Sequence, residues 1–149
     1  MGWVNDLKGK TVGLDTAPLI YLIEQHPAFL PNIEPFFEAV DRADIHLVTT
    51  TITLIEVLVH PLRKGDETLA QRYNDILLTS PNLTAVPISV SIAQLAAELR
   101  AQHGLKTPDA IQIAASIQHG AAAFLTNDRD LSSIHEISVL NVGDLAPDP

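Results

Sequence analysis

The sequence predicts an α/β protein in which a mainly parallel sheet is covered on both faces by helices. Short β-branched and apolar runs alternate along the chain with longer segments whose apolar residues recur at helical spacing. Gly and Pro mark the ends of these segments, and neither a low-complexity stretch nor an internal repeat interrupts them. Because 149 residues with 46% hydrophobic side chains suffice for one core, we expect a single domain over residues 1–149.

The first half of the chain is expected to hold two strands and four helices. Pro18 suits the first turn of the first helix, His26-Pro27 and Pro31 break the chain after it, and Gly65 separates the last two helices. In chain order we expect a strand over 11–15, helices over 17–24 and 33–43, a strand over 45–49, and helices over 51–62 and 66–78.

The second half is expected to add three strands and two helices. Gly104 is a C-terminal cap of the first helix, and Thr107-Pro108 opens the second, with Thr107 as N-cap and Pro108 at the first position. In chain order we expect a strand over 83–88, helices over 89–103 and 107–119, a strand over 122–126, a turn at 127–130 and a strand over 137–142.

Composition excludes several classes of protein. The formal charge is −9, from 18 Asp and Glu against 9 Lys and Arg, which rules out a broad basic surface for nucleic acid but not a local metal site on carboxylates. Without Cys there is no disulfide, thiolate zinc site or cysteine nucleophile. No apolar run reaches the length of a membrane span and no signal peptide is evident, so we expect a cytoplasmic protein.

Four carboxylates occupy positions where α/β proteins carry chemistry. Asp15 follows the first strand, Asp109 lies in a first helical turn and Asp128 follows a later strand. Each alone has an ordinary interpretation: an N-cap, a dipole partner or a turn former. Glu56 stands among apolar neighbours, where an unpaired carboxylate is costly, so a cation ligand fits it best, and the alternatives are an exposed stripe or a buried ion pair with a basic residue.

A cluster of carboxylates without Cys favours Mg²⁺ or Mn²⁺ over zinc. The six His residues are scattered and show no His-x-x-x-His spacing, so we expect them to form no competing metal site. The sequence lacks a P-loop, a Gly-x-Gly-x-x-Gly and a Gly-x-Ser-x-Gly motif. A phosphatase of the haloacid dehalogenase type needs a second Asp two residues after Asp15, where this chain has Ala17.

Four segments of the chain resemble the acidic motifs of PIN domains, most closely those of VapC-type toxin ribonucleases. They are residues 14–20 (LDTAPLI), Glu56 in its apolar helix, residues 106–114 (KTPDAIQIA) and residues 124–131 (FLTNDRDL). The resemblance runs in order from about residue 12 to 142. It implies a three-layer α/β/α sandwich. One departure is Ala17, where many members have Asn or Ser.

The resemblance also implies a Mg²⁺- or Mn²⁺-dependent endoribonuclease that cleaves RNA by in-line attack of a metal-activated water. The acidic site would comprise Asp15, Glu56, Asp109 and Asp128, with Asp130 as a further candidate ligand. Supporting hydrogen bonds would come from Thr16 and Thr126, and phosphate contacts from Lys106 and Arg129. Since clustered carboxylates repel one another, we expect at least one raised pKa without metal.

Partners are expected as well. Members of this kind are often toxins that pair with an antitoxin, and they are often homodimers. The apolar helices over 19–23 and 52–59 are apolar on more than one face, which fits a partner surface or plain core burial. The alternative is a non-catalytic PIN-like module that binds protein or RNA, which loss of one or more acids would indicate.

Overall fold

The sheet of the protein is entirely parallel. The computed structural model describes residues 2–147 and contains one five-stranded sheet with the order β3-β2-β1-β4-β5. All four strand pairs are parallel. The strands are β1 (Thr11–Leu14), β2 (His46–Thr50), β3 (Leu83–Val86), β4 (Ala123–Thr126) and β5 (Ser138–Asn141). The predicted fold class is confirmed.

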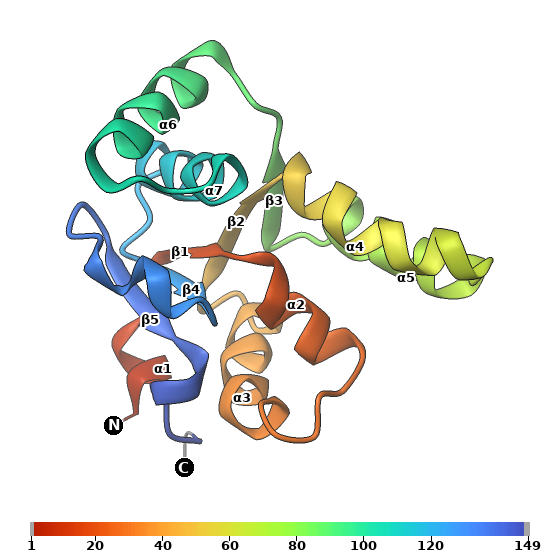
Figure 1. Cartoon of the computed structure of the whole chain (residues 1–149). Coiled ribbons are helices and arrows are strands. Elements are labelled where there is room, and N and C mark those ends of the chain that lie inside the picture. Colours follow the sequence, from red (N-terminus) through yellow and green to blue (C-terminus); the bar gives the residue numbers. More distant parts are fainter. Residues whose placement is uncertain (1, 148–149) are drawn as a thin grey trace.

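Helices cover both faces of this sheet, as Figure 1 shows. The α-helices are α1 (Trp3–Asp6), α2 (Thr16–Ile23), α3 (Leu30–Asp41), α4 (Thr51–Lys64), α5 (Glu67–Thr79), α6 (Val90–His103) and α7 (Thr107–Gln118), with short 3-10 helices η1 (Arg129–Ser133) and η2 (Val142–Asp144). One apolar cluster joins the sheet to α1 through α5, and the other joins it to α6, α7 and η1. The three-layer arrangement therefore has two separate cores.

Several boundaries differ from those expected, and one helix was not predicted. Helix α3 begins at Leu30, so Pro31 does not break the chain but lies in the first helical turn, where its missing N–H is harmless. Helix α7 is capped by Lys106, whose backbone is extended, so Thr107 is already helical and is not the N-cap. Helix α1 has no counterpart among the predicted elements, because four residues are too few for a periodic pattern.

The strand order reverses direction at β1, and that reversal fixes where chemistry can occur. The chain runs outward from β1 to β2 and β3, then crosses back over the opposite face through α6 and α7 to reach β4 on the other side of β1. In open parallel sheets the crevice beyond the carboxyl ends of the strands at such a switch point is the usual binding site. Asp15 directly follows β1, and Asp128 lies two residues beyond β4.

Gly13 in the middle of β1 lets α7 lie against the sheet. A Cβ built on Gly13 would lie 2.6 Å from Cβ of Ser116 and 2.9 Å from Cδ1 of Phe124, distances that packed atoms do not adopt. Ser116 is itself buried on α7, and its hydroxyl donates to the carbonyl of Gln112 at 2.8 Å. The helix that carries Asp109 therefore depends on the absence of a side chain at this point.

Helix α4 presents an apolar stripe to solvent. Ile55, Val59 and Leu62 recur at helical spacing and are 60%, 41% and 65% exposed. The inward face of the same helix buries Thr53 and Val57. The expectation that this helix is apolar on more than one face is confirmed for α4, and core burial covers only one of those faces. Among residues 2–147, no helix combines the length and the apolar character needed to cross a membrane.

Candidate active site

Asp15 is held at the end of β1 by two hydrogen bonds. One carboxylate oxygen accepts from the backbone N–H of Thr16 at 2.8 Å, which makes Asp15 the N-cap of α2. The other accepts from the hydroxyl of Thr126, the last residue of β4, at 2.7 Å. The N-cap interpretation and a place in the acidic site are therefore compatible, since the carboxylate bridges two neighbouring strand ends.

Thr126 also positions the loop that carries the fourth acid. Its buried Oγ1 accepts from the backbone N–H of Asp128 at 3.0 Å while its hydroxyl hydrogen goes to Asp15. Asp128 in turn caps η1, accepting from the N–H of Asp130 at 2.9 Å. One buried hydroxyl thus connects two of the expected acids.

Glu56 lies in a different setting from the one expected. Glu56 is exposed, and so is its neighbour Ile55, which faces solvent instead of a core. The expectation of buried surroundings for Glu56 was therefore wrong, and the alternative of an exposed stripe is the one that the structure shows. Its oxygen Oε1 accepts from the hydroxyl of Thr16 at 2.5 Å, which brings it next to Asp15 across 40 residues of chain.

Asp109 completes the cluster from the first turn of α7, and its ionisation is strongly perturbed. Partial burial raises the pKa of Asp109 to about 6, and the charges of Asp15, Asp128 and Glu56 push in the same direction, while Lys106 opposes them. Burial also raises the pKa of Asp15, with the charges of Glu56 and Asp128 adding to it, although hydrogen bonds from Thr126 and Thr16 act against the shift. The pKa is thus raised for both groups, with burial as the larger cause and the expected repulsion between carboxylates as the smaller one.

A buried polar network runs from this cluster into the space between α4 and α7. The hydroxyl of Thr53 lies 3.3 Å from that of Thr16 and 2.8 Å from that of Thr49. Gln112, three residues beyond Asp109 on α7, donates from Nε2 to Thr53 at 2.5 Å. The side chains of Thr49, Thr53 and Gln112 are no more than 2% exposed.

The direction of each hydrogen bond in this network follows from the number of hydrogens available. Thr49 donates its only hydroxyl hydrogen to the carbonyl of Leu14, so it must accept from Thr53. Thr53 then accepts from Gln112, whose amide orientation is set because the hydroxyl of Thr50 donates to its Oε1 at 2.7 Å. The end of β2 therefore fixes α7, and with it the first turn that carries the carboxylate of the cluster.

Two of these hydrogen bonds meet at Thr53, which donates to Thr49 and accepts from Gln112. Replacing Thr53 by Val keeps the shape but leaves the Gln112 amide without its acceptor, so we expect a loss of about 1–3 kcal/mol in unfolding free energy. The Thr53→Ser variant keeps the hydroxyl and is the matched control, expected to lose less. Urea denaturation of both variants measures the difference, and equal stability of the two would contradict the network.

A cleft of about 220 Å³ opens beside the acids. Four of its lining residues are Lys106, Asp109, Asp128 and Asp130. Asp130 thus lies at the cleft but is absent from the charges that shift Asp15 and Asp109, whereas Asp128 acts on both. The geometry favours Asp128 over Asp130 as the fourth member of the cluster.

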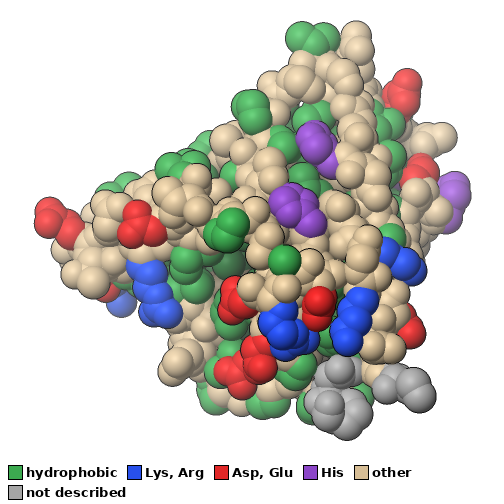
Figure 2. All heavy atoms as spheres, turned by 180° about the vertical axis from the view of Figure 1, so that it is seen from behind, with side chains coloured by type: hydrophobic (Ala, Val, Ile, Leu, Met, Phe, Trp, Pro, Cys, Tyr) green, Lys and Arg blue, Asp and Glu red, His purple; other side chains and the backbone are tan. Residues whose placement is uncertain are grey.

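The two basic residues expected to contact phosphate, Lys106 and Arg129, differ in whether their charge is already paired. Lys106 lies at the cleft and its charge acts on Asp109. Arg129 instead makes a bidentate pair with Asp144, with N–O distances of 3.1 and 2.9 Å. On the face drawn in Figure 2, blue and red side chains are interspersed, and no continuous basic surface forms. Lys106 is therefore the better candidate for a phosphate contact.

Sequence reasoning missed one grouping of side chains. His103, His135 and Glu136 converge although 33 residues separate His103 from Glu136, so the expectation of scattered histidines was wrong for this pair. No local spacing could have indicated it, because the contact depends on how the end of α6 meets the segment before β5. It differs from the four acids in composition, with two imidazoles and one carboxylate.

The donor set of the acidic cluster fits a hard divalent cation. Four carboxylates and two threonine hydroxyls supply oxygen ligands only, which is the chemistry that Mg²⁺ and Mn²⁺ select. Burial is the main cause of the raised pKa of Asp109 and of Asp15, and the neighbouring carboxylate charges add to it, so both ionised groups are at an energetic disadvantage that a cation would reduce. The residues that would hold it are Asp15, Glu56, Asp109 and Asp128.

Comparison with known proteins supports this architecture. The model of the PIN domain family matches residues 12–137. VapBC2 from Rickettsia felis, solved bound to a promoter DNA fragment, superposes with a TM-score of 0.69 at 21% identity, covering 88% of this chain and 98% of that one. A toxin–antitoxin complex from Klebsiella pneumoniae gives 0.62 at 24% identity, covering 89% and 97%.

A third similar structure is VapC20 of Mycobacterium tuberculosis, described as a sarcin-ricin loop cleaving toxin. It superposes with a TM-score of 0.66 at 17% identity and covers 85% of this chain and 98% of that one. At these identities the superpositions establish the fold. Among curated proteins, none matches the sequence.

Proposed function

The chain belongs to the PIN domain family, and from that premise we propose that it is a Mg²⁺- or Mn²⁺-dependent endoribonuclease, the toxin of a toxin–antitoxin pair. One observation carries the proposal: four carboxylates from four separate segments meet at the switch point of the sheet. Core packing does not require such a cluster, since burial and the neighbouring negative charges both disfavour the ionised forms of Asp15 and Asp109. A divalent cation that binds phosphate explains it.

The protein side chains have distinct tasks in this proposal. A bound Mg²⁺ or Mn²⁺ would supply Lewis acidity toward the scissile phosphate and lower the pKa of water. Asp15 is locked in place by Thr126 and by the start of α2, so its oxygens cannot rotate away. Thr16 holds Glu56 against the cluster, and Lys106 offers a positive charge for a neighbouring phosphate.

RNA cleavage tests the proposal directly. Purified protein incubated with single-stranded RNA is expected to cut it when Mg²⁺ or Mn²⁺ is present and to stop when a chelator removes the metal. The products are expected to carry 5′-phosphate and 3′-hydroxyl ends. Cleavage that is equal with and without chelator would exclude the metal-dependent mechanism, and no cleavage of any RNA would favour the alternative of a non-catalytic binding module.

The toxin role has its own support. Similar structures include complexes described as VapBC and as toxin–antitoxin complexes. In this chain the exposed stripe of Ile55, Val59 and Leu62 begins immediately before Glu56 and runs along the same helix. We propose that an apolar helix of an antitoxin covers this stripe and thereby blocks the acidic site. The expected homodimer stays a prediction that light scattering can check.

Co-expression separates the partner surface from catalysis. Expression of the chain alone is expected to inhibit growth. We expect a small reading frame for the antitoxin just upstream of its gene, and its co-expression should relieve the inhibition. A Leu62→Glu variant is expected to stay toxic but to escape this relief, because a charge interrupts the stripe. Glu98→Gln on α6, which is exposed and far along the chain, is the control that should still be neutralised. Relief of Leu62→Glu equal to wild type would place the antitoxin elsewhere.

A further inference from the structure

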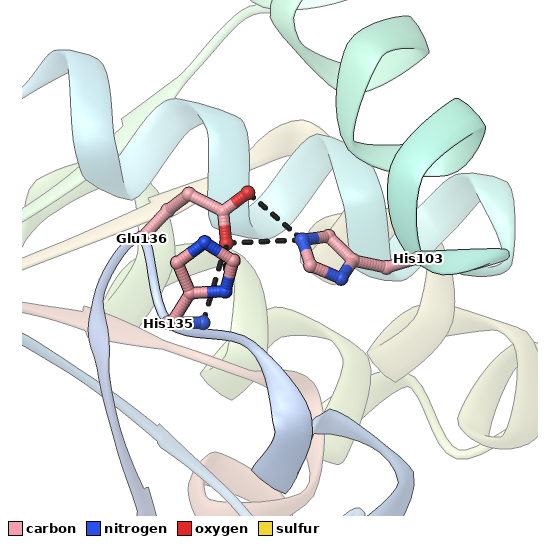
Figure 3. A group of neighbouring side chains, drawn as sticks. All are labelled: His103, His135 and Glu136. Carbon is pink, nitrogen blue, oxygen red and sulfur yellow. Dashed lines mark hydrogen bonds and ion pairs between the residues drawn. The ribbon is translucent and has the colours of Figure 1, made fainter.

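We propose that His103, His135 and Glu136 form a binding site for a zinc-type dication, separate from the carboxylate cluster. His103 is the last residue of α6, and the other two lie in the segment between η1 and β5. Figure 3 shows both imidazole rings beside one carboxylate. This inference does not depend on whether the protein cleaves RNA.

The distances match what a tetrahedral ion needs after small adjustments. Nε2 of His103 lies 2.8 and 3.0 Å from the two oxygens of Glu136, and Nδ1 of His135 lies 3.5 Å from one of them. The three ligand atoms all fall within 4.8 Å of one another. Metal–ligand bonds of about 2.0–2.2 Å at tetrahedral angles place ligand atoms about 3.3 Å apart.

The chemistry of the three side chains favours zinc over magnesium. Imidazole nitrogen is a ligand that Zn²⁺, Cu²⁺ and Ni²⁺ prefer, whereas Mg²⁺ prefers oxygen. Two His and one Glu form a set that leaves a fourth position for water. The proton on Nε2 of His103 that now faces Glu136 would move to Nδ1 of the same ring.

Two of the three side chains already hold each other in place, and the third is free to adjust. The side chains of His103 and Glu136 are 14% and 25% exposed and already paired, while that of His135 is 79% exposed. The rings of the two histidines lie 5.5 Å apart in an edge-to-face arrangement, so His135 stays close without packing into a core. An ion can therefore recruit His135 by rotation of an exposed side chain.

A metal ion at this site would stabilise one side of the cleft beside the acidic cluster. His103 lines the cleft together with Asp109, Asp128 and Leu131. The segment that carries Glu136 continues directly from η1, whose N-cap is Asp128. A bound ion would thus cross-link α6 to the loop beside the acidic cluster and restrict its motion.

Zinc titration by calorimetry tests the proposal, with millimolar Mg²⁺ present to compete for the carboxylate cluster. The wild type is expected to bind one Zn²⁺, and Co²⁺ in its place is expected to show the visible absorption of a tetrahedral site. The His135→Ala variant is expected to bind at least about tenfold more weakly, since loss of even a supporting group costs that much affinity. Because His135 is exposed, this variant is expected to fold normally.

Two controls assign the ion to its site. His60→Ala removes an exposed histidine on α4 and should leave zinc binding unchanged. Asp109→Asn alters the acidic cluster and should also leave it unchanged. Zinc binding that survives His135→Ala but is lost in Asp109→Asn would assign the ion to the carboxylates and overturn the proposal, as would the absence of zinc binding in the wild type.

Discussion

Replacement of Asp109 by Asn is expected to reduce RNA cleavage at least about 100-fold, since loss of a metal ligand exceeds the effect of losing a supporting group. The same change is expected to raise the melting temperature of the metal-free protein. Asn is nearly isosteric with Asp but removes a partly buried charge that faces Asp15, Asp128 and Glu56. Allowing for partial exposure of the group, we expect a gain of about 1 kcal/mol, or about 2–4 °C.

The pH dependence of stability provides a second signature of the same carboxylate. Because the pKa of Asp109 in the folded protein is about 6, well above the ordinary value of an Asp carboxyl, the folded state binds this proton more tightly than the unfolded state does. Metal-free wild type should therefore lose stability as pH rises from about 4 through about 6, and this loss should be smaller in Asp109→Asn. Denaturant titrations across that range measure it.

Comparison with a surface variant makes these results specific. Glu98→Gln on α6 removes one negative charge from an exposed position and should change neither cleavage nor the pH dependence. Addition of Mg²⁺ should stabilise the wild type by mass action and Asp109→Asn much less. A lower melting temperature for metal-free Asp109→Asn would contradict like-charge repulsion at this site, and undiminished cleavage would remove Asp109 from the mechanism.

Replacement of Gly13 by Ala is expected to be the most destabilising single methyl addition in the sheet. The added Cβ would overlap the side chain of Ser116 and lie 2.9 Å from Phe124, so α7 must move away from β1. Overpacking of this kind costs about 3 kcal/mol at the upper end of its usual range, which corresponds to a drop of about 6–12 °C in melting temperature. Thermal unfolding followed by circular dichroism measures it.

A second substitution tests the cause of that loss. Ser116→Gly in the Gly13→Ala background removes the overlapping side chain and should restore part of the lost stability, although Ser116→Gly alone should destabilise the helix. The two changes are therefore expected to be non-additive. Strict additivity would mean that the contact between β1 and α7 does not limit the packing.

The order of elements and the placement of three acids could be predicted because both depend on local patterns. Strand and helix periodicities depend on a few neighbouring residues. In open α/β sheets, functional residues commonly follow the carboxyl ends of the parallel strands. Asp15 and Asp128 therefore emerged as candidates from their positions after strands, and Asp109 from its place in a first helical turn. The wrong boundaries at Pro31 and Thr107 both concern the start of a helix, where the backbone conformation of a single residue determines which residue is the N-cap.

Glu56 shows where this reasoning fails. Its apolar neighbours suggested burial, but burial depends on which face of α4 meets the rest of the protein, and the structure turns Ile55 and Glu56 outward. The acid still reaches the cluster, through Thr16. A periodic pattern predicts that a helix has an apolar face, but only the tertiary packing decides which face is covered by the rest of the protein.

Local order along the chain thus determined the alternating elements, the parallel sheet and the candidate acids, because hydrophobic period, caps and turn residues act between near neighbours. Tertiary structure alone decided the contacts that join distant residues: Gln112 to Thr53, Thr126 to Asp15, and His103 to Glu136. Each of these depends on the angle and depth at which one element packs on another. That geometry depends on the packing of the whole core, including the close contact that glycine allows at position 13. It cannot be predicted from any short stretch of sequence.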